Sequence, residues 1–413
     1  MKRRVVITGI GAVTPIGHGS RGLYDGLRRE TSAIDRITRF DPEPFPSKIA
    51  GEVRDFDAAA YLEPRRLRRL DRYSQFAVAC ARMAIEDARL DPSEEDRDAI
   101  GCFVGSAVAG AAFAEEQHTV FMTQGIQRVR PTLALSVFCG AASCNIAIEF
   151  DLRGPSSANS DSCTSGAIAI GEAFRTVRDG YAEIMLAGGV EAPLTPLIFG
   201  AFGIIRAMSI RNADPARACR PFDRGRDGFV MAEGAALLVC EELEHARRRG
   251  ASIYGEVLGY GTSNDAHHMV APLPSGVQAA RAMRCALNEA GIPAEAIGYV
   301  NAHASSTPLN DTTETLAIKQ VMGDHAYRIP ISGTKALHGH ALGATGAIEA
   351  AICMLAFRHA YLPPTINLED PDPECDLDYI PGHGREMAVD YILSNSFGFG
   401  GINASLVFGQ VPA

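Results

Sequence analysis

The segment DSCTSGAIAIGEAF, residues 161–174, sets a cysteine at the start of a helical pattern. Cys163 directly precedes Thr164, Ser165 and Gly166, and small and apolar residues then recur with helical spacing. Free amides and the positive end of a helix dipole lower the pKa of a thiol and favour the thiolate, which is the reactive nucleophile. We therefore expect Cys163 to be a nucleophile with a lowered pKa, and a buried structural cysteine is the alternative.

Two histidine segments supply candidate partners for this thiol. His303 follows an apolar run in YVNAHASSTPLNDTTE, residues 299–314, and His338 and His340 precede a Gly/Ala-rich helix in SGTKALHGHALGATGAIEA, residues 332–350. Imidazoles act as acids, bases and hydrogen-bond donors near neutral pH. They also bind zinc, but neither segment has the i, i+4 histidine pair of a helical zinc site. Acid–base and hydrogen-bonding roles therefore rank ahead of a metal site.

A fourth segment, LSNSFGFGGINASLVF at residues 393–408, places Phe397 and Phe399 among three glycines. Glycines at this density leave backbone N–H groups accessible, as an oxyanion hole requires. A glycine-rich strand crossing would give the same pattern. The Gly9–Gly11 turn, by contrast, has Thr14 where a dinucleotide-binding motif needs its third glycine, so it is interpreted as a structural turn.

These segments must be held by an α/β framework. Short Val/Ile-rich runs alternate with helical patterns from residue 5 onward, and a second series of the same plan begins near residue 251. Its helices include residues 312–322, and its strands include GYVNAHA at residues 298–304. The sequence predicts two fused halves of similar architecture, residues 1–250 and 251–413, with long insertions in the first half.

The composition excludes several classes of protein. The chain has 413 residues, of which 46% are hydrophobic and 21% are charged, as in compact globular proteins. A net charge of −10 argues against a nucleic-acid partner. The longest uncharged stretch, residues 131–148, is too polar to cross a membrane, and the ten cysteines form no C-x-x-C pair, which favours a reducing cytoplasm. Two arginine groups could dock an acidic partner, although solvated helix faces would look the same: Arg65, Arg66, Arg68, Arg69, and Arg206, Arg211, Arg217, Arg220.

In this order, the four segments resemble the beta-ketoacyl-[acyl carrier protein] synthases of the thiolase superfamily, most closely the type II enzymes. The similarity extends along nearly the whole chain, for example through RPFDRGRDGFVMAEGA at residues 220–235 and LPPTINLEDPDPECDLDYIP at residues 362–381. It implies a thiolase-like fold with layers in the order αβαβα. It also implies a catalytic triad of Cys163, His303 and His340, with Lys335 and Glu349 as a conserved lysine and its acidic partner.

The resemblance also implies a reaction. Cys163 takes an acyl group from a carrier protein, with the oxyanion held by the N–H groups of Cys163 and Phe399. The two histidines then stabilise the enolate formed when malonyl-carrier protein loses CO2. No metal or cofactor is expected, because phosphopantetheine arrives on the carrier protein. Thiolases would have a second cysteine late in the chain, where this chain has Asn395 and Phe399, and type III synthases would have Asn in place of His340.

Substrate contacts follow from the same resemblance. Ser305 and Thr307 are expected to bind the pantetheine arm, and Phe399 to gate the acyl channel. The expected acyl-pocket residues are Val108, Leu133, Phe202 and Phe399. Val108 and Leu133 replace the Ile and Phe usual in this family, which enlarges the pocket and leaves fatty-acid and polyketide elongation both open.

Two other functions are compatible with this fold. One is a catalytically inert chain-length-factor partner, and the other is a binding protein that kept only the fold. Cys163 counts against the first and the intact triad against the second. Family members dimerise, with residues 131–150 near the interface and Leu133 reaching the neighbour's acyl pocket. The partner could be a second copy of the chain or a paralogue.

Overall fold

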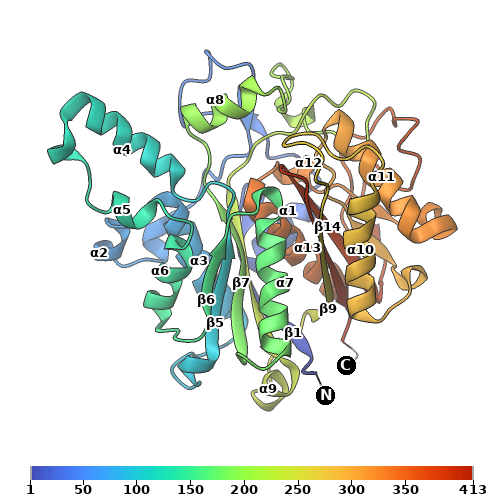
Figure 1. Ribbon diagram of the computed structural model, residues 1–413, viewed down its shortest axis with the longest axis horizontal. Helices are drawn as coiled ribbons and strands as arrows, with labels where there is room; N and C mark the ends of the chain where they lie inside the picture. Colours follow the sequence, from blue (N-terminus) through green and yellow to red (C-terminus); the bar gives the residue numbers. More distant parts are fainter. Residues whose placement is uncertain (1, 412–413) are drawn as a thin grey trace.

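The computed structural model describes residues 2–411, and its core is one eleven-stranded mixed sheet (Figure 1). The spatial order is β11-β10-β14-β15-β9-β1-β8-β7-β5-β6, with β2 paired to β1. The strands of the first half are β1 (Val5–Thr14), β5 (Ile100–Gly105), β6 (Ser156–Asn159), β7 (Ile184–Glu191) and β8 (Gly234–Glu242). Those of the second half are β9 (Gly255–Asn264), β10 (Tyr299–Asn301), β11 (Ile331–Ser332), β14 (Tyr391–Gly398) and β15 (Ile402–Gly409).

The two halves repeat one topology. From the centre outward, the strands of each half follow the chain order first, fifth, fourth, second, third. In each half the two inner pairs are antiparallel and the two outer pairs are parallel. The first strands of the halves, β1 and β9, pair antiparallel and join them. The prediction of two similar α/β halves is therefore confirmed, and the exact division at residue 250 stays a prediction.

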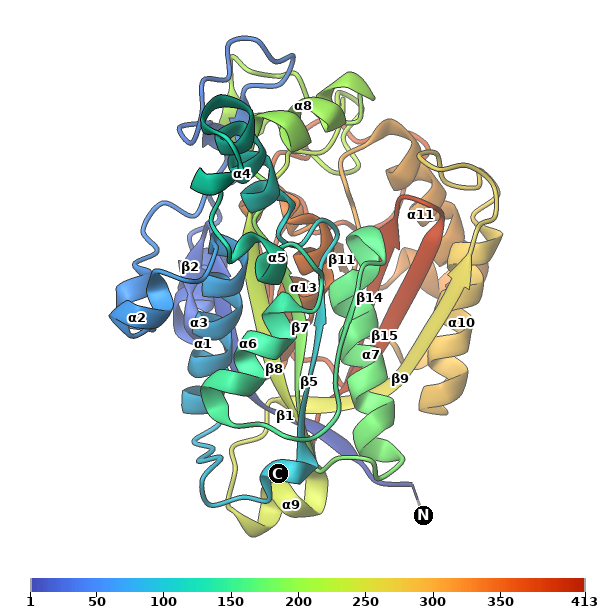
Figure 2. The same cartoon turned by 60° about the vertical axis from the view of Figure 1, so that its left-hand side comes forward.

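Two helices lie between the half-sheets and form the middle layer. In Figure 2, α7 (Ser165–Arg178) stands between β5 and β7 on one side and β14, β15 and β9 on the other. Its counterpart α13 (Thr345–His359) contacts α7 and is buried from Thr345 to Phe357. Its sequence, TGAIEAAICMLAF, is apolar on almost every side, as a helix without a solvent face requires.

Further helices cover the outer faces of the sheet. The principal ones are α3 (Arg72–Asp87) and α6 (Ala141–Phe150) on the first half, and α10 (Val277–Ala290) and α11 (Pro308–Met322) on the second. The helix predicted at residues 312–322 therefore begins four residues earlier, because Thr307 caps it and Pro308 suits its first position. The predicted strand at residues 298–304 is shorter, since β10 ends at Asn301.

The long insertions expected in the first half are α4 (Ala111–Gln124) and α5 (Leu133–Ser136), which project to one side in Figure 1, and α8 (Pro196–Ile204). Within residues 2–411, no helix is both long and apolar enough to cross a bilayer. The remaining elements are α1 (Gly19–Arg28), α2 (Pro64–Leu67), α9 (Leu243–Arg248), α12 (Lys335–His338), β2 (Gly17–His18), β3 (Asp35–Arg36), β4 (Ile49–Ala50), β12 (Tyr361–Leu362) and β13 (Arg385–Glu386).

Candidate active site

Cys163 lies in a single turn of 3-10 helix, Ser162–Thr164, that leads directly into α7. The preceding Ser162 has a φ of 56°, a left-handed conformation that is uncommon outside glycine. This tight turn after β6 carries Cys163 to the wall of a pocket, where the residue is only 8% exposed. The predicted position of the thiol at a helix start is therefore present in the structure.

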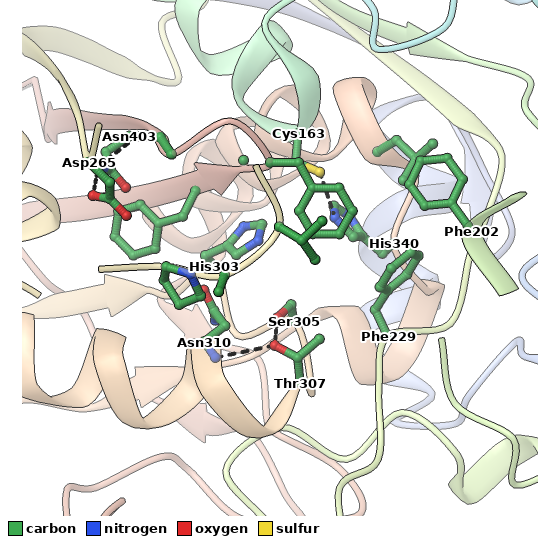
Figure 3. A pocket seen from close by; sticks show the side chains of 18 residues that line it. Cys163, Phe202, Phe229, Asp265, His303, Ser305, Thr307, Asn310, His340 and Asn403 are labelled. Atoms are coloured by element: carbon green, nitrogen blue, oxygen red, sulfur yellow. Dashed lines mark hydrogen bonds between the residues drawn. The ribbon is translucent and has the colours of Figure 1, made fainter. Parts of the chain in front are cut away.

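The two histidines converge on this thiol (Figure 3). His340 Nε2 lies 3.2 Å from Cys163 Sγ, and its Nδ1 lies 2.9 Å from the hydroxyl oxygen of Thr345. The His303 ring meets the His340 ring edge to face, with centroids 5.4 Å apart and planes at 81°. Loops after β6, β10 and α12 thus bring together three side chains that are far apart in the chain.

A buried network holds the backbone of His303. Lys335 donates from Nζ to the His303 carbonyl and to Glu349 Oε1, the latter at 2.5 Å. On the other side, Glu314 accepts the N–H groups of His303 and Ala304 at 2.9 and 2.8 Å. Lys335, Glu349 and Glu314 are all fully buried.

Sequence reasoning missed Glu314 and Thr345 as members of the site. Both lie within the segments that carry the histidines, and Thr345 comes only five residues after His340. Nothing in their local pattern distinguishes them from ordinary helix residues, because their partners are selected by the tertiary fold.

Burial shifts the pKa of Cys163 in the direction opposite to the one that we expected. It raises the pKa of the thiol to about 11, although the Ser162 hydroxyl, the Lys335 charge and the Phe399 N–H act in the opposite direction. Burial also holds the pKa values of His303 and His340 well below the usual range, and the nearby Lys335 charge adds to this effect. At neutral pH the resting site therefore holds a protonated thiol beside a neutral imidazole that can accept its proton.

Two backbone N–H groups flank the sulfur. Phe399 N–H approaches Cys163 Sγ from the turn after β14. Within residues 2–411, neither it nor the N–H of Cys163 donates to a backbone carbonyl. Gly400 and Gly401 have φ values of 84° and 73°, which make this turn possible. Both N–H groups are therefore available to an oxyanion.

Aromatic side chains form one wall of the pocket and hydroxyls another. Phe399 stacks on Phe202 with centroids 6.1 Å apart, and Phe202 meets Phe229 edge to face. Ser305 and Thr307 are hydrogen-bonded to each other at 2.9 Å. All five residues line the pocket together with Cys163, His303 and His340, and so do Asp265, Val270, Ala271, Pro272, Asn310, Leu342, Phe397, Gly398, Gly401 and Asn403 (Figure 3).

Three other candidate residues lie outside this pocket. Val108 follows β5 and is half-buried, and Leu133 begins α5 and is also half-buried. Neither lines the pocket formed by this single chain, so their acyl-binding roles stay predictions. His338 is buried with its Nε2 3.2 Å from Thr334, and burial lowers its pKa to about 3. Within residues 2–411, no three His, Cys, Asp or Glu side chains are grouped as a metal site would require.

Comparison with known proteins gives a consistent result. The chain matches the family models described as Beta-ketoacyl synthase, N-terminal domain over residues 2–246 and Beta-ketoacyl synthase, C-terminal domain over residues 254–369. It is 47% identical to 3-oxoacyl-[acyl-carrier-protein] synthase 2 of Synechocystis over 98% of each chain. The protein of the same name from Coxiella burnetii is 45% identical over 99% of each.

Solved structures agree with these matches. A type II PKS ketosynthase in complex with its acyl-carrier protein superposes with a TM-score of 0.92 at 37% identity, covering 100% of both chains. The ishigamide ketosynthase/chain length factor superposes with a TM-score of 0.93 at 36% identity, again over 100% of both. Fold, site geometry and full-length similarity lead to one conclusion: the chain belongs to the beta-ketoacyl synthase family.

Proposed function

We propose that this chain is a beta-ketoacyl-acyl carrier protein synthase, an acyltransferase that extends an acyl chain by decarboxylative Claisen condensation. The observation that carries the proposal is the contact between Cys163 Sγ and His340 Nε2 at 3.2 Å, with His303 facing the same space. A thiol, a neutral base and a second imidazole in one closed pocket match the needs of acyl transfer followed by enolate formation.

In the first half-reaction the Cys163 proton moves to His340 Nε2, and the thiolate attacks the carbonyl of an acyl thioester. The N–H groups of Cys163 and Phe399 bind the oxyanion of the tetrahedral intermediate. Its collapse breaks the bond to the phosphopantetheine sulfur, which leaves with the proton from His340. An acyl group remains on Cys163.

In the second half-reaction the malonyl thioester loses CO2, and the electron pair of the broken carbon–carbon bond forms an enolate. His303 and His340 donate hydrogen bonds to the enolate oxygen. The carbanion attacks the acyl-Cys163 carbonyl, the Cys163 thiolate leaves, and the β-ketoacyl chain stays on the carrier protein.

Thr345 allows His340 to serve in both half-reactions. The imidazole accepts a proton at Nε2 in the first and donates one from Nε2 in the second, so its Nδ1 must change role as well. A hydroxyl both donates and accepts, and Thr345 lies 2.9 Å from Nδ1. The reaction as written balances without a metal or a bound cofactor.

The carrier protein is the proposed macromolecular partner, and exposed arginines supply a docking surface for an acidic protein. Arg66 of the first predicted group instead binds Glu149 at 3.0 Å, and Arg220 of the second is buried against Asp223. Within residues 2–411, five exposed arginines of this kind form no ion pair: Arg65, Arg68, Arg69, Arg128 and Arg206.

A dimer is the second proposed assembly. Strand β6 ends the sheet and pairs on one side only, and the neighbouring insertions expose large apolar side chains. A second copy would cover both, and it would place Leu133 near the neighbouring acyl pocket. The same surface would accept a paralogue. Ten free cysteines in the described chain support a reducing cytoplasm as the place of action.

Intact-mass spectrometry tests the activity directly. Wild type, Cys163→Ala and Cys144→Ala are incubated with a series of acyl-carrier proteins and then with malonyl-carrier protein. Cys144 is exposed on α6, so its variant controls for adventitious thiol acylation. We expect an acyl adduct on wild type and Cys144→Ala that malonyl-carrier protein discharges, and none on Cys163→Ala. An adduct that survives in Cys163→Ala, or none in wild type, refutes the assignment.

A further inference from the structure

Glu191 is a fully buried carboxylate at the end of β7, outside the group of residues that touch the thiol. Four donors fill its two oxygens. Oε1 accepts from the Ser106 hydroxyl at 2.8 Å and from Val108 N–H at 3.1 Å. Oε2 accepts from Ala107 N–H at 2.7 Å and from Gly343 N–H at 2.9 Å. A buried carboxylate that accepts four hydrogen bonds is held in one position, and it in turn holds the four donors in place.

The four donors come from the two halves of the molecule. Ser106, Ala107 and Val108 form the turn after β5, and Gly343 belongs to the short helix Leu342–Ala344 after His340. The two turns touch each other, since a Cβ added to Gly343 would lie 2.4 Å from Ala107 N and 2.8 Å from Glu191 Oε2. Glu191 therefore joins two loops that lie so close together that residue 343 has no space for a side chain.

One of these loops lines the reaction space, and the other packs against the apolar residues around the thiol. Leu342 lines the pocket with Cys163, and Ala107 packs into the same apolar cluster as Cys163, Leu342, Phe202 and Phe399. Leu342 has a φ of 40°, which an isolated leucine avoids and which only its surroundings can impose. The hydrogen bond from the next residue, Gly343, to Glu191 is part of that constraint.

We propose that Glu191 is a positioning residue that holds the Ala107–Val108 turn against the Leu342–Gly343 turn and thereby determines which acyl groups fit beside Cys163. This inference rests on the proposed condensing activity.

The isosteric variant Glu191→Gln has one preferred orientation. On the Oε2 side both partners are backbone N–H groups, so an amide NH2 there would face two donors. The side-chain oxygen must therefore take the Oε2 position, and the NH2 group takes the Oε1 position against Val108 N–H. The variant keeps Ala107 and Gly343 bound but repels the Val108 end of the turn. The expected result is a shift of the Ala107–Val108 turn, and with it of the apolar cluster around Cys163 that Ala107 packs against, beside an intact catalytic triad.

Glu241→Gln is the matched control. Glu241 is also a fully buried carboxylate, and it lies opposite Ile184, at the other end of the β7–β8 ladder from Glu191. Its partners there are Thr8, His245 and Arg249, and none of them lines the catalytic pocket. Both substitutions remove a buried charge, but only Glu191→Gln changes hydrogen bonds to the two loops near Cys163.

The experiment measures kcat/KM for a series of acyl-carrier proteins of increasing chain length at pH 8. Burial raises the pKa of Glu191 to about 7, so the wild-type carboxylate is ionised at that pH. We expect Glu191→Gln to change the ratio of kcat/KM between long and short acyl groups on the order of tenfold, as a displaced apolar wall does. Glu241→Gln should leave this ratio unchanged.

An unchanged ratio in Glu191→Gln, or the same uniform loss in both variants, overturns the inference. If Glu191→Gln does not fold, the milder Ser106→Ala decides, because it removes one donor from Oε1 and should shift the ratio in the same direction. A wild type that forms no acyl adduct would refute the proposed function instead, so the two failures are distinguishable.

Discussion

Burial sets the protonation of the three side chains that are proposed to be catalytic. Each of the three is less than a tenth exposed: Cys163, His303 and His340. Burial raises the pKa of the thiol and lowers the pKa values of both imidazoles, so each group favours its neutral form. The resting thiol is therefore a weak nucleophile, and in the proposed reaction it becomes reactive when His340 takes its proton. A protected thiol of this kind resists adventitious alkylation and oxidation.

The pH dependence of thiol alkylation follows from this. Because burial raises the pKa of Cys163 to about 11, we expect its rate of reaction with iodoacetamide to rise continuously from pH 7 to pH 10. Mass spectrometry of the Cys163 peptide measures the rate, with the exposed Cys144 peptide as an internal reference. A plateau at or below the ordinary cysteine pKa of about 8.5 would contradict the raised value.

Lys335 stabilises the site through its buried ion pair with Glu349. Burial raises the pKa of Glu349 to about 7 even beside Lys335, so in Lys335→Met this carboxyl loses its partner and is driven toward its protonated form. We expect a loss in the free energy of unfolding of at most about 3–5 kcal/mol, the cost of an unpaired buried charge. The pKa values of His303 and His340 should rise, because the Lys335 charge contributes to their depression. Urea unfolding measures the first effect and NMR titration of the imidazoles the second.

The double variant Lys335→Met/Glu349→Gln is the control for this interpretation. It should recover part of the lost stability, since it also removes the unpaired carboxylate. Equal losses in the single and double variants would show that the unpaired charge is not the cause.

At the scale of elements, the site depends on how closely α7 and α13 pack. A Cβ added to Gly346 of α13 would lie 2.7 Å from the Ser396 hydroxyl oxygen and 2.9 Å from Ala167 Cβ of α7. The start of α13 carries Thr345, and the start of α7 follows Cys163. Any separation of these helices therefore moves Thr345, which is hydrogen-bonded to His340, away from Cys163.

Opposite effects are expected for two glycine substitutions in helices. Gly346→Ala should destabilise the fold, although alanine is the better helix former by about 1 kcal/mol, because the added methyl has no space. In α1, a Cβ at Gly22 would have no contact shorter than 3.4 Å, so Gly22→Ala should stabilise by about 0.5–1 kcal/mol. Thermal unfolding of both variants checks the signs, and two stabilised variants would exclude close helix packing as the constraint.

At the scale of the whole molecule, one part of the surface has the features of an interface. The insertions of the first half and α6 expose large apolar side chains next to the edge strand β6, and unpaired strand edges and apolar patches are both characteristic of interfaces. The exposed residues are Phe121, Met122, Ile126, Leu135, Val137, Phe138 and Ile148.

A charge in this patch should weaken self-association. Ile148 is 67% exposed on α6, so Ile148→Asp costs the monomer little but places a carboxylate in the proposed interface. Light scattering after size-exclusion chromatography should show a dimer for wild type and a monomer or weaker dimer for Ile148→Asp. Met387→Asp, at an exposed position in the second half, should remain dimeric. A monomeric wild type would contradict the proposed dimer.

Carrier-protein recognition is expected to depend on charge. Arg206→Glu should raise KM for acyl-carrier protein on the order of tenfold and leave KM for an acyl-pantetheine thioester unchanged. The control Arg281→Glu changes another exposed arginine, on the outer helix α10. Equal effects of the two variants would argue for a general influence of net charge rather than a docking surface.

The sequence by itself determined the fold class and the family, and it indicated the groups that are proposed to react. Hydrophobic periodicity is local, so the alternation of strands and helices and the repeat of two halves follow from it. Distinctive segments hold Cys163, His303, His340, Lys335 and Phe399, and the resemblance of those segments to the beta-ketoacyl synthases indicated the reaction.

Only the tertiary structure decided how these groups behave. The rise in the Cys163 pKa depends on what covers the thiol, and the cover comes from segments near residues 202, 340 and 399. The roles of Glu314, Thr345 and Glu191 likewise depend on partners that folding brings to them, across 152 residues in the contact between Glu191 and Gly343. Desolvation and hydrogen bonding between distant segments have no local pattern in a sequence, so these properties could not be predicted from it.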